Sequence, residues 1–403
     1  MKRHILFLIS GIICTLSQAQ INLIGTVNGG TGAMQIAEWQ VFDPSSLVVH
    51  PTNLQSYVYG SSVYDAWNGN YYLTGELTNS GFGLFSFNSM TKEQGFNTFS
   101  SFSSITEIDM GTAKIYTLTM EGPDTIRVNE YDIATGNTIL LGVVSEPGLQ
   151  GIITEATGFD SNHGILYYVG FSGNSQRLLY AINVRDQMFN YTTIPLTTPS
   201  SYISLTCINY DNLNDKLYGL MTTYDSTWAF GANSVAEIDY ITGNVSELGE
   251  LTGITGYVGG SSSFDQLSGS FLLVGIDTSS SIQMIVFNTY NSSFVTGYIP
   301  DGVSEIVCDN YAYARSVYTS SDGDIALQGR LKVFPIPAMD QLSVELPFQG
   351  ELRIIDSHGR IVFSQATNDL RPVISLAGFP AGLYIIESRN AEQISRARFI
   401  KAE

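Results

Sequence analysis

The sequence predicts an all-β protein in which a six-bladed β-propeller precedes a small Ig-like β-sandwich. Three observations support this fold class. Short apolar segments and turn residues repeat through the body at spacings of 44 to 56 residues, a period typical of propellers with four strands per blade. A second set of short strands follows residue 331. The segment before it, Ser320 to Asp324, is small and polar, so residues 317–330 are expected to form a linker.

The N-terminus has the features of an export signal. Lys2 and Arg3 precede an apolar run, residues 5–14, that is too short to span a bilayer. Small residues before position 20 predict cleavage between Ala19 and Gln20, so residues 1–19 are expected to be a signal peptide read by the Sec route. No other segment is long and apolar enough to cross a membrane, and the mature protein is expected to be soluble.

The first repeated pattern is an Asp followed, six and seven residues later, by two apolar or aromatic residues. Turn formers such as Asn and Gly separate them. An Asp can accept hydrogen bonds from backbone amides in such a turn, so each copy predicts a β-hairpin. The copies are Asp65 with Tyr71 and Tyr72, Asp109 with Ile115 and Tyr116, Asp160 with Leu166 and Tyr167, Asp211 with Leu217 and Tyr218, and Asp265 with Phe271 and Leu272.

The second repeated pattern is an apolar residue followed by Asp or Asn at the end of an alternating strand. It occurs at Asp43, Asn88, Asp132, Asn183, Asp239 and Asn288. The N-terminal segment therefore supplies later strands of one blade without an inner hairpin, and residues 303–313 are expected to supply the missing strand. We expect residues 20–316 to form a propeller of about six blades, one shared between both ends, with seven blades as the main alternative.

The charge of the chain limits its partners. The whole chain has 18 basic and 37 acidic residues, and the body without its signal carries a net charge of −21. Such a surface repels phosphate backbones, so nucleic acid is not an expected partner. The acidity also agrees with solubility outside the cell.

The C-terminal residues 331–403 carry several ordered motifs. Pro335, Pro337 and Asp340 follow a strand, an Asp-Ser-His-Gly turn ends at Gly359, and a Gly-Leu-Tyr strand contains Gly382 and Tyr384. The last strand ends at Lys401. This order resembles the C-terminal sorting domain of type IX secretion cargo from Bacteroidetes-type bacteria, although Ile336 replaces the usual Asn. The resemblance implies binding to the type IX machinery and delivery to the outer-membrane surface or the medium.

The sequence contains few signs of catalytic chemistry. No metal-binding spacing of His or Cys occurs, and there is neither a nucleophile elbow nor a phosphate-binding loop. We therefore predict no catalytic, metal-binding or cofactor-binding residue. Glu155 and Glu305 lie near predicted inner strands, where an enzyme would place a carboxylate pair. Cys207 and Cys308 belong to separate repeats and are expected to be buried free thiols.

One connection is longer than its counterparts. Residues 222–233 join two strands of the fourth hairpin repeat and contain Tyr224, Asp225, Trp228 and Phe230. Long loops on rigid scaffolds often carry function, so these residues are the candidate ligand site; the alternative is that the rings only cap the blade. We expect a binding protein for a glycan or another protein. The alternatives are a secreted hydrolase or lyase with channel carboxylates, and a structural surface protein.

Overall fold

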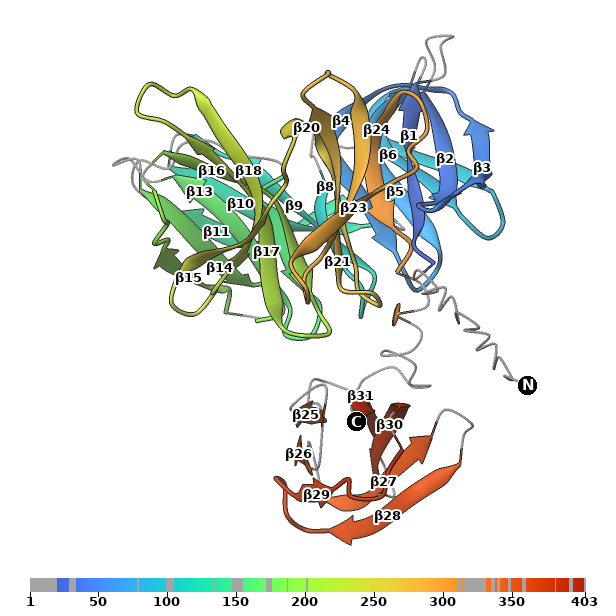
Figure 1. Ribbon diagram of the computed structural model, residues 1–403. Helices are drawn as coiled ribbons and strands as arrows, with labels where there is room; N and C mark the ends of the chain where they lie inside the picture. The colour runs from blue at the N-terminus through green and yellow to red at the C-terminus, as the bar shows by residue number, and fades with distance from the viewer. Residues whose placement is uncertain are drawn as a thin grey trace, which may run out of the picture. The chain divides into compact units, whose positions relative to one another are not determined.

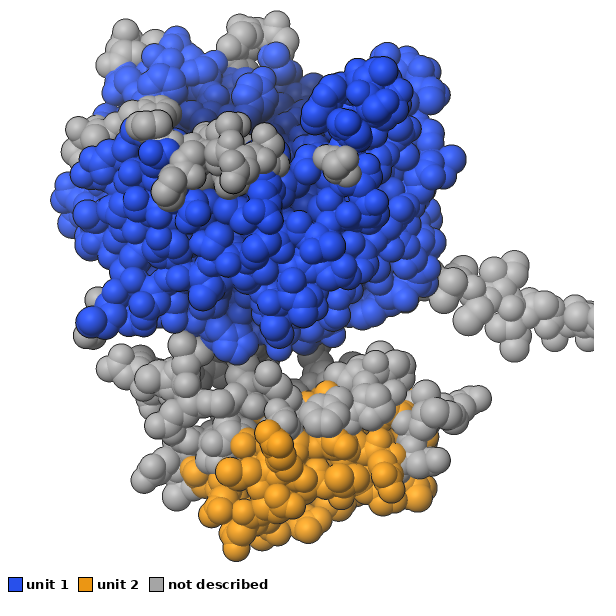
Figure 2. Space-filling model, turned by 90° about the vertical axis from the view of Figure 1, so that its left-hand side faces the viewer, with its two compact units in different colours: residues 1–311 blue, residues 312–403 orange. Residues whose placement is uncertain are grey.

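The computed structural model describes residues 20–28, 34–77, 80–98, 105–122, 124–133, 135, 137–146, 155–171, 176–186, 188–200, 202–310, 313–314, 331–334, 338, 341–346, 349–356, 360–380, 382–390 and 394–401. The chain divides into two compact units, Met1–Tyr311 and Ala312–Glu403 (Figure 2). The predicted signal peptide, the predicted linker and the motif residues Pro335, Pro337, Asp340 and Gly359 lie outside the described residues.

The described strands of unit 1 form six four-stranded antiparallel sheets, which we number as blades 1 to 6 (Figure 1). Blade 1 has the order β24 (Val303–Cys308), β1 (Asn22–Asn28), β2 (Met34–Gln40) and β3 (Asp43–Pro51). Blade 2 comprises β4 (Leu54–Asp65), β5 (Asn70–Leu77), β6 (Gly81–Asn88) and β7 (Gln94–Thr98). Blade 3 comprises β8 (Ile105–Asp109), β9 (Lys114–Met120), β10 (Thr125–Asp132) and β11 (Asn137–Ser145).

The remaining blades follow in chain order. Blade 4 comprises β12 (Thr157–Asp160), β13 (Ile165–Phe171), β14 (Arg177–Asn183) and β15 (Asn190–Pro195). Blade 5 comprises β16 (Ile203–Asp211), β17 (Lys216–Tyr224), β18 (Phe230–Ile238) and β19 (Val245–Glu250). Blade 6 comprises β20 (Ile254–Asp265), β21 (Ser270–Asp277), β22 (Ile282–Asn288) and β23 (Ser293–Gly297).

The innermost strands enclose a central channel. They are β24, β4, β8, β12, β16 and β20; each contacts the next in this order, and β20 contacts β24. β24 pairs with β1, with Leu23 opposite Cys308, so a strand from the end of unit 1 completes the sheet that begins it. The all-β propeller fold that the repeats predicted is therefore the fold of this unit.

The repeated Asp residues close the turns after the inner strands. Asp211, for example, is fully buried, and its Oδ1 accepts hydrogen bonds from the amides of Leu213 and Asn214 at 2.9 and 3.1 Å. Asp65 and Asp160 accept bonds from the second and third following amides in the same way. The predicted role of these Asp residues is confirmed, because their carboxylates satisfy amides that the hairpin turn leaves unpaired.

The repeated aromatic residues hold neighbouring blades together. In three repeats, the ring seven residues after the Asp stacks on the ring that directly precedes the Asp of the next blade. The stacked pairs are Tyr116 with Phe159, Tyr167 with Tyr210, and Tyr218 with Phe264, at centroid separations of 5.1, 5.5 and 5.5 Å. The apolar core accordingly lies between the blades, where the faces of adjacent sheets bury their side chains.

Amide side chains form a polar clasp, a pair of hydrogen bonds to the backbone of the neighbouring blade, between three pairs of blades, and a serine hydroxyl makes a similar contact between a fourth pair. Asn212 accepts a hydrogen bond from the Ser161 amide at 2.6 Å and donates one to the carbonyl of Phe159 at 3.3 Å. Its side chain therefore replaces the backbone partner that a neighbouring strand would supply. Gln266 and Asn310 each make the same two hydrogen bonds to the preceding blade. Ser161 makes only the accepted bond, from the amide of Met110.

Replacing Asn212 with Leu is expected to destabilise unit 1 by about 2–5 kcal/mol, because a buried amide and a buried carbonyl lose their partners. Asn137, which is exposed, offers a matched control: Asn137→Leu is expected to change stability by about 0.5 kcal/mol or less. Denaturant unfolding of both variants measures the difference. Equal midpoints for the two variants would show that the clasp contributes no stability.

Unit 2 consists of two sheets. Three strands form the order β25 (Lys332–Phe334), β26 (Gln341–Glu345) and β29 (Val373–Ser375). Four strands form the order β28 (Ile361–Thr367), β27 (Gly350–Asp356), β30 (Gly382–Arg389) and β31 (Ile394–Lys401). Residues of both sheets share one apolar cluster, which includes Leu342, Val344, Leu352, Ile354 and Phe399. Within the described part of the chain, no helix is both long enough and apolar enough to cross a membrane.

Candidate functional site

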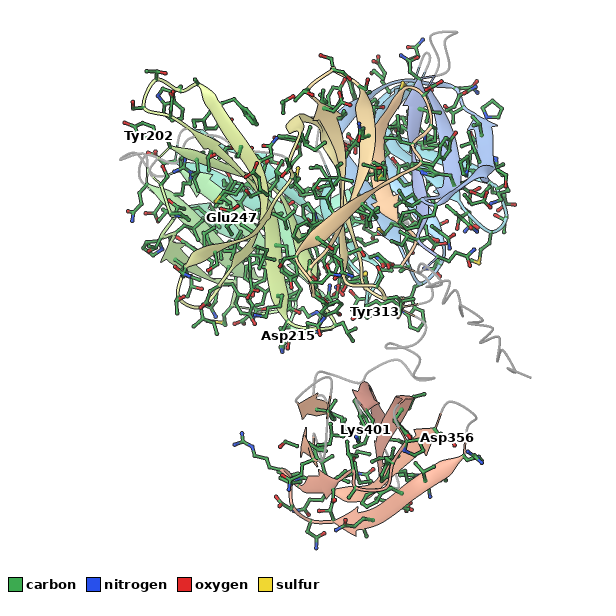
Figure 3. The ribbon with its side chains drawn as sticks, viewed as in Figure 1. Tyr202, Asp215, Glu247, Tyr313, Asp356 and Lys401 are labelled. Atoms are coloured by element: carbon green, nitrogen blue, oxygen red, sulfur yellow. The ribbon has the colours of Figure 1, made fainter. Side chains whose placement is uncertain are left out.

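The connection between β17 and β18 of blade 5 presents aromatic side chains to solvent. It spans residues 225–229 and, contrary to the prediction from the sequence, is not longer than all of its counterparts, because β17 extends to Tyr224 and β18 begins at Phe230. Trp228 and Phe230 are 63% and 42% exposed. The side chain of Trp228 is therefore not packed beneath its blade. Figure 3 shows Tyr202 near one end of the strands of unit 1 and Asp215, in the hairpin turn of blade 5, near the other end. Since Tyr202 directly precedes β16, it lies at the same end as the β17–β18 connection.

Asp225 organises the turn that displays Trp228. Its Oδ1 accepts bonds from the amides of Thr227 and Ala229 at 2.7 and 3.0 Å, and from the Thr227 hydroxyl at 2.7 Å. Its backbone pairs with Trp228 and Ala229. These bonds hold Trp228 at a φ of 62°, a left-handed conformation that is unusual for a bulky residue and marks a locally enforced geometry.

Two tyrosines contact the indole of Trp228. The Tyr202 ring meets it edge-on, with centroids 5.5 Å apart and planes at 90°, and the Tyr224 ring is tilted at 5.9 Å. Tyr224 also lies opposite Phe230 in the β17–β18 pairing. We call Tyr202, Tyr224, Trp228 and Phe230 the aromatic cluster. Tyr202 carries no signal in the sequence, because only the fold places the start of β16 beside the β17–β18 connection.

Asp225 remains charged at this surface. Hydrogen bonds from the Thr227 hydroxyl and from the amides of Ala229 and Thr227 lower the pKa of its carboxyl below the ordinary value. All of its side-chain bonds to described residues are made by Oδ1. Oδ2 is therefore an acceptor beside the aromatic cluster that can receive a hydrogen bond from a ligand.

A second polar region lies in the central channel. A cavity of about 140 Å³ is lined by residues of the inner strands or of the segments next to them, and Glu107 and Glu155 are among its lining residues. Ser62, Thr157, Asn209 and Ser262 supply further polar groups. Burial raises the pKa of Glu107 to about 8, although Thr157 bonds to it, and burial also raises the pKa of Glu155.

Glu305 joins two blades. It is fully buried, and its two oxygens accept bonds from the Gly60 amide at 2.6 Å and the Ser62 hydroxyl at 2.7 Å. Both partners belong to blade 2, so this carboxyl ties blade 1 to its neighbour. Glu305 does not line the described cavity. The charge of Glu155 still acts on Glu305, and Glu107, which the sequence did not single out, lines the cavity together with Glu155.

Glu107 makes stability dependent on pH. Because its pKa is raised from 4.5 to about 8 on folding, the folded state binds more protons between these values. The stability that this proton uptake gives the folded state is fully present below about pH 4.5 and is lost as the pH rises through 8. Glu107→Gln is therefore expected to flatten this part of the stability profile and to stabilise the protein at pH 8 by on the order of 1–3 kcal/mol.

Thermal melts at pH 5 and pH 8 test this expectation, with Glu250→Gln as a control at an exposed glutamate in β19. The control is expected to follow the wild type at both pH values. A Glu107→Gln profile that also follows the wild type would mean that this carboxyl does not exchange its proton on folding.

Both described cysteines are buried and free, as predicted. Cys207 lies in a bulge of β16 at a φ of 53°, and its thiol donates a long hydrogen bond to Glu155 at 3.8 Å. Burial, together with the charge of Glu155, raises the pKa of this thiol, so it remains protonated and a poor nucleophile. The described residues contain no group of three or more His, Cys, Asp or Glu that could hold a metal ion.

The described sorting-motif residues of unit 2 lie on β30 and β31. Tyr384 is 5% exposed; its hydroxyl donates to the Pro380 carbonyl at 2.8 Å, and its ring stacks on Phe399 at 5.4 Å. Gly382 lies opposite Lys401 in the pairing of the two strands. The Gly-Leu-Tyr motif therefore serves the packing of the unit, because its aromatic ring fills the apolar core.

Comparisons with known proteins agree with both units. Residues 332–402 match the family model of the secretion system C-terminal sorting domain. This match shows that the chain is exported and sorted by the type IX system to the cell surface or the medium, and it implies an interaction with the type IX machinery. No curated protein matches the chain.

Several solved structures resemble the chain. TolB from Acinetobacter baumannii has a TM-score of 0.51 and 11% identity, with 72% of this chain and 66% of the TolB chain covered. The chain therefore covers slightly less than two thirds of that TolB. A putative TolB from Agrobacterium tumefaciens has a TM-score of 0.45 and 10% identity, with 71% of this chain and 92% of that chain covered. A putative 6-phosphogluconolactonase from Bacteroides uniformis has a TM-score of 0.42 and 14% identity, with 72% of this chain and 100% of that chain covered. At these identities, the likeness to the first TolB shows the propeller fold alone.

Proposed function

We propose that the protein is an exported carbohydrate-binding module and that the aromatic cluster of blade 5 is its binding surface. The observation that carries the proposal is the 63% exposure of Trp228 on a turn whose backbone Asp225 holds in place. Exposing a large apolar ring to water is unfavourable unless a ligand covers it, and a rigid turn reduces the entropy lost when it does.

The chemistry of the cluster suits a sugar. Pyranose rings have apolar C–H faces that pack on tryptophan and tyrosine, while their hydroxyl groups need acceptors close by. Asp225 Oδ2 provides such an acceptor beside Trp228. The net charge of −21 on the body favours a neutral or cationic glycan over a sulfated or uronic one, because like charges repel during encounter. A protein ligand would use the same aromatic surface and is the other outcome of a binding screen.

Trp228→Ala is expected to weaken binding of neutral oligosaccharides at least tenfold while leaving the fold intact, since exposed aromatic anchors carry much of the binding energy. Fluorescence titration with neutral gluco-, manno- and xylo-oligosaccharides measures the effect. Trp39 and Trp67 also emit, so the variant is titrated beside the wild type.

Tyr290→Ala is the matched control. Tyr290 is 62% exposed, close to the value for Trp228, but it lies in the β22–β23 turn. Its hydroxyl accepts a hydrogen bond from Asn214 in the β16–β17 turn, which is at the end of blade 5 opposite to the aromatic cluster. This variant is expected to bind like the wild type. If both substitutions weakened oligosaccharide binding equally, or if neither weakened it, the aromatic cluster would not be the binding surface.

A second function has one observation in its favour. Glu107 and Glu155 line the same channel cavity, and with a pKa of about 8 Glu107 is largely protonated at neutral pH, as a general acid requires. A secreted hydrolase or lyase would use the two carboxyls in this way. Release of reducing ends from a polysaccharide panel, abolished by Glu107→Gln and unaffected by Trp228→Ala, would favour the enzyme over the binding module.

We also propose the processing of the chain. The predicted signal peptide, residues 1–19, is removed by Sec-dependent export, which leaves Gln20 as the first residue. The propeller then comprises residues 20–316, and the polar linker 317–330 separates it from the sorting domain, residues 331–403. N-terminal sequencing of the exported protein and mass measurement of its C-terminus test these boundaries.

A further inference from the structure

One edge of the four-stranded sheet of unit 2 is unprotected. β28 is the last strand in the order β28-β27-β30-β31, and β27 is its one strand partner among the described residues (Figure 1). Five of its seven residues are exposed, including Ile361 at 54% and Val362 at 43%. An edge strand of this kind presents a row of backbone donors and acceptors that can pair with another strand.

The two edges of this sheet differ in sequence. β28 reads Ile-Val-Phe-Ser-Gln-Ala-Thr and contains neither a charged residue nor proline. β31, the opposite edge, contains Arg396 and Arg398. Proteins usually protect exposed edges with charges or proline, because these prevent unwanted strand addition. By this criterion β31 is protected and β28 is left open.

The exposed apolar side chains of unit 2 lie in the same part of the chain. Among its described residues, the large hydrophobic side chains that are exposed are Ile361, Val362, Leu370 and Val373. Two belong to β28, and the others lie in the segment that leads into β29 and at its start. On β28, Phe363 packs against the core, and a register shift at Val362 leaves this residue without a paired partner on β27. A strand added to this edge would pair with β28 through backbone hydrogen bonds. It would also cover the exposed apolar side chains of β28.

We propose that β28 is the docking edge of the sorting domain, at which an extended segment of the type IX machinery adds as a further strand. The type IX machinery is the partner because unit 2 matches a sorting domain, whose function requires recognition by that machinery. This inference concerns unit 2 and does not depend on the proposed ligand of unit 1.

The test places lysines on the open edge. The double variant Ile361→Lys/Val362→Lys is produced as the full chain in a bacterium with a type IX system, and its surface fraction is measured by protease treatment of whole cells. The surface fraction is expected to fall at least tenfold, with folded precursor retained in the periplasm. Val48→Lys, on the outer strand β3 of unit 1 and 50% exposed, is the matched control and is expected to be delivered normally.

A second measurement covers the case in which the double variant does not fold. A photo-crosslinking amino acid at position 362 is expected to join the chain to an identified type IX component during export, whereas the same group at position 48 is not. Wild-type delivery of the folded double variant would overturn the proposal. So would the absence of a type IX crosslink from position 362 in a chain that reaches the surface, or a dimer of the chain formed through β28.

Discussion

Deleting Leu331 to Glu403 is expected to abolish surface delivery while leaving a folded propeller in the periplasm. The sorting-domain match covers residues 332–402, and unit 1 contains its own apolar clusters between blades. The shortened chain therefore loses its recognition element without losing its core. Protease treatment of whole cells and fractionation of the periplasm measure the two effects.

The signal peptide is kept in this deletion, so passage across the inner membrane is unchanged. The purified periplasmic protein is expected to melt cooperatively, which separates a sorting defect from misfolding. Normal surface delivery of the shortened chain would contradict the role of unit 2 in export.

A chain that ends at Asp301 is expected to lose cooperative folding, whereas a chain that ends at Thr319 is expected to fold. The shorter chain lacks β24, which pairs with β1 along five residue pairs. It also lacks Glu305, which binds blade 2, and Asn310, which clasps blade 6. β1 then becomes an open edge, and open edges promote aggregation.

Thermal unfolding of the two shortened chains measures this difference. A loss of several kcal/mol in a unit of this size lowers the melting temperature by roughly 5–10 °C. Light scattering during the melt reports aggregation of the shorter chain. Equal melting temperatures, with no difference in scattering, would mean that β24 does not close the ring.

The sequence predicted the propeller fold well because its repeats mark positions with a fixed structural role. An Asp such as Asp211 must close its turn, and an aromatic such as Tyr218 must stack on the next blade, so both recur at constant spacing. These inter-blade hydrogen bonds were missed, although Asn212, Gln266 and Asn310 each stand directly after an Asp. Their meaning depends on the neighbouring blade, which lies about 50 residues away.

The channel was harder to predict, and the reason is physical. Strand alternation assigns side chains to faces only where the pairing is regular. Register shifts occur beside both carboxylates: between Ile105 and Glu107 in β8, and between Val303 and Glu305 in the pairing of β24 with β1. As a result, Glu305 turned into a contact with blade 2, while Glu107, which sequence analysis did not select, lines the cavity. The exposed position of Trp228 followed from its loop, but the contact with Tyr202 required the fold.

Hydrogen exchange in the presence of a bound sugar tests most directly whether the aromatic cluster is the site. The tightest-binding neutral oligosaccharide from the titration panel is added to the mature protein, and the protection of backbone amides is compared with and without it. We predict slower exchange in residues 222–233 and around Tyr202, with no change in the turn that contains Tyr290. Protection confined to the channel segments, residues 105–109 and 155–160, or no protection with any sugar of the panel, would contradict the proposed binding surface.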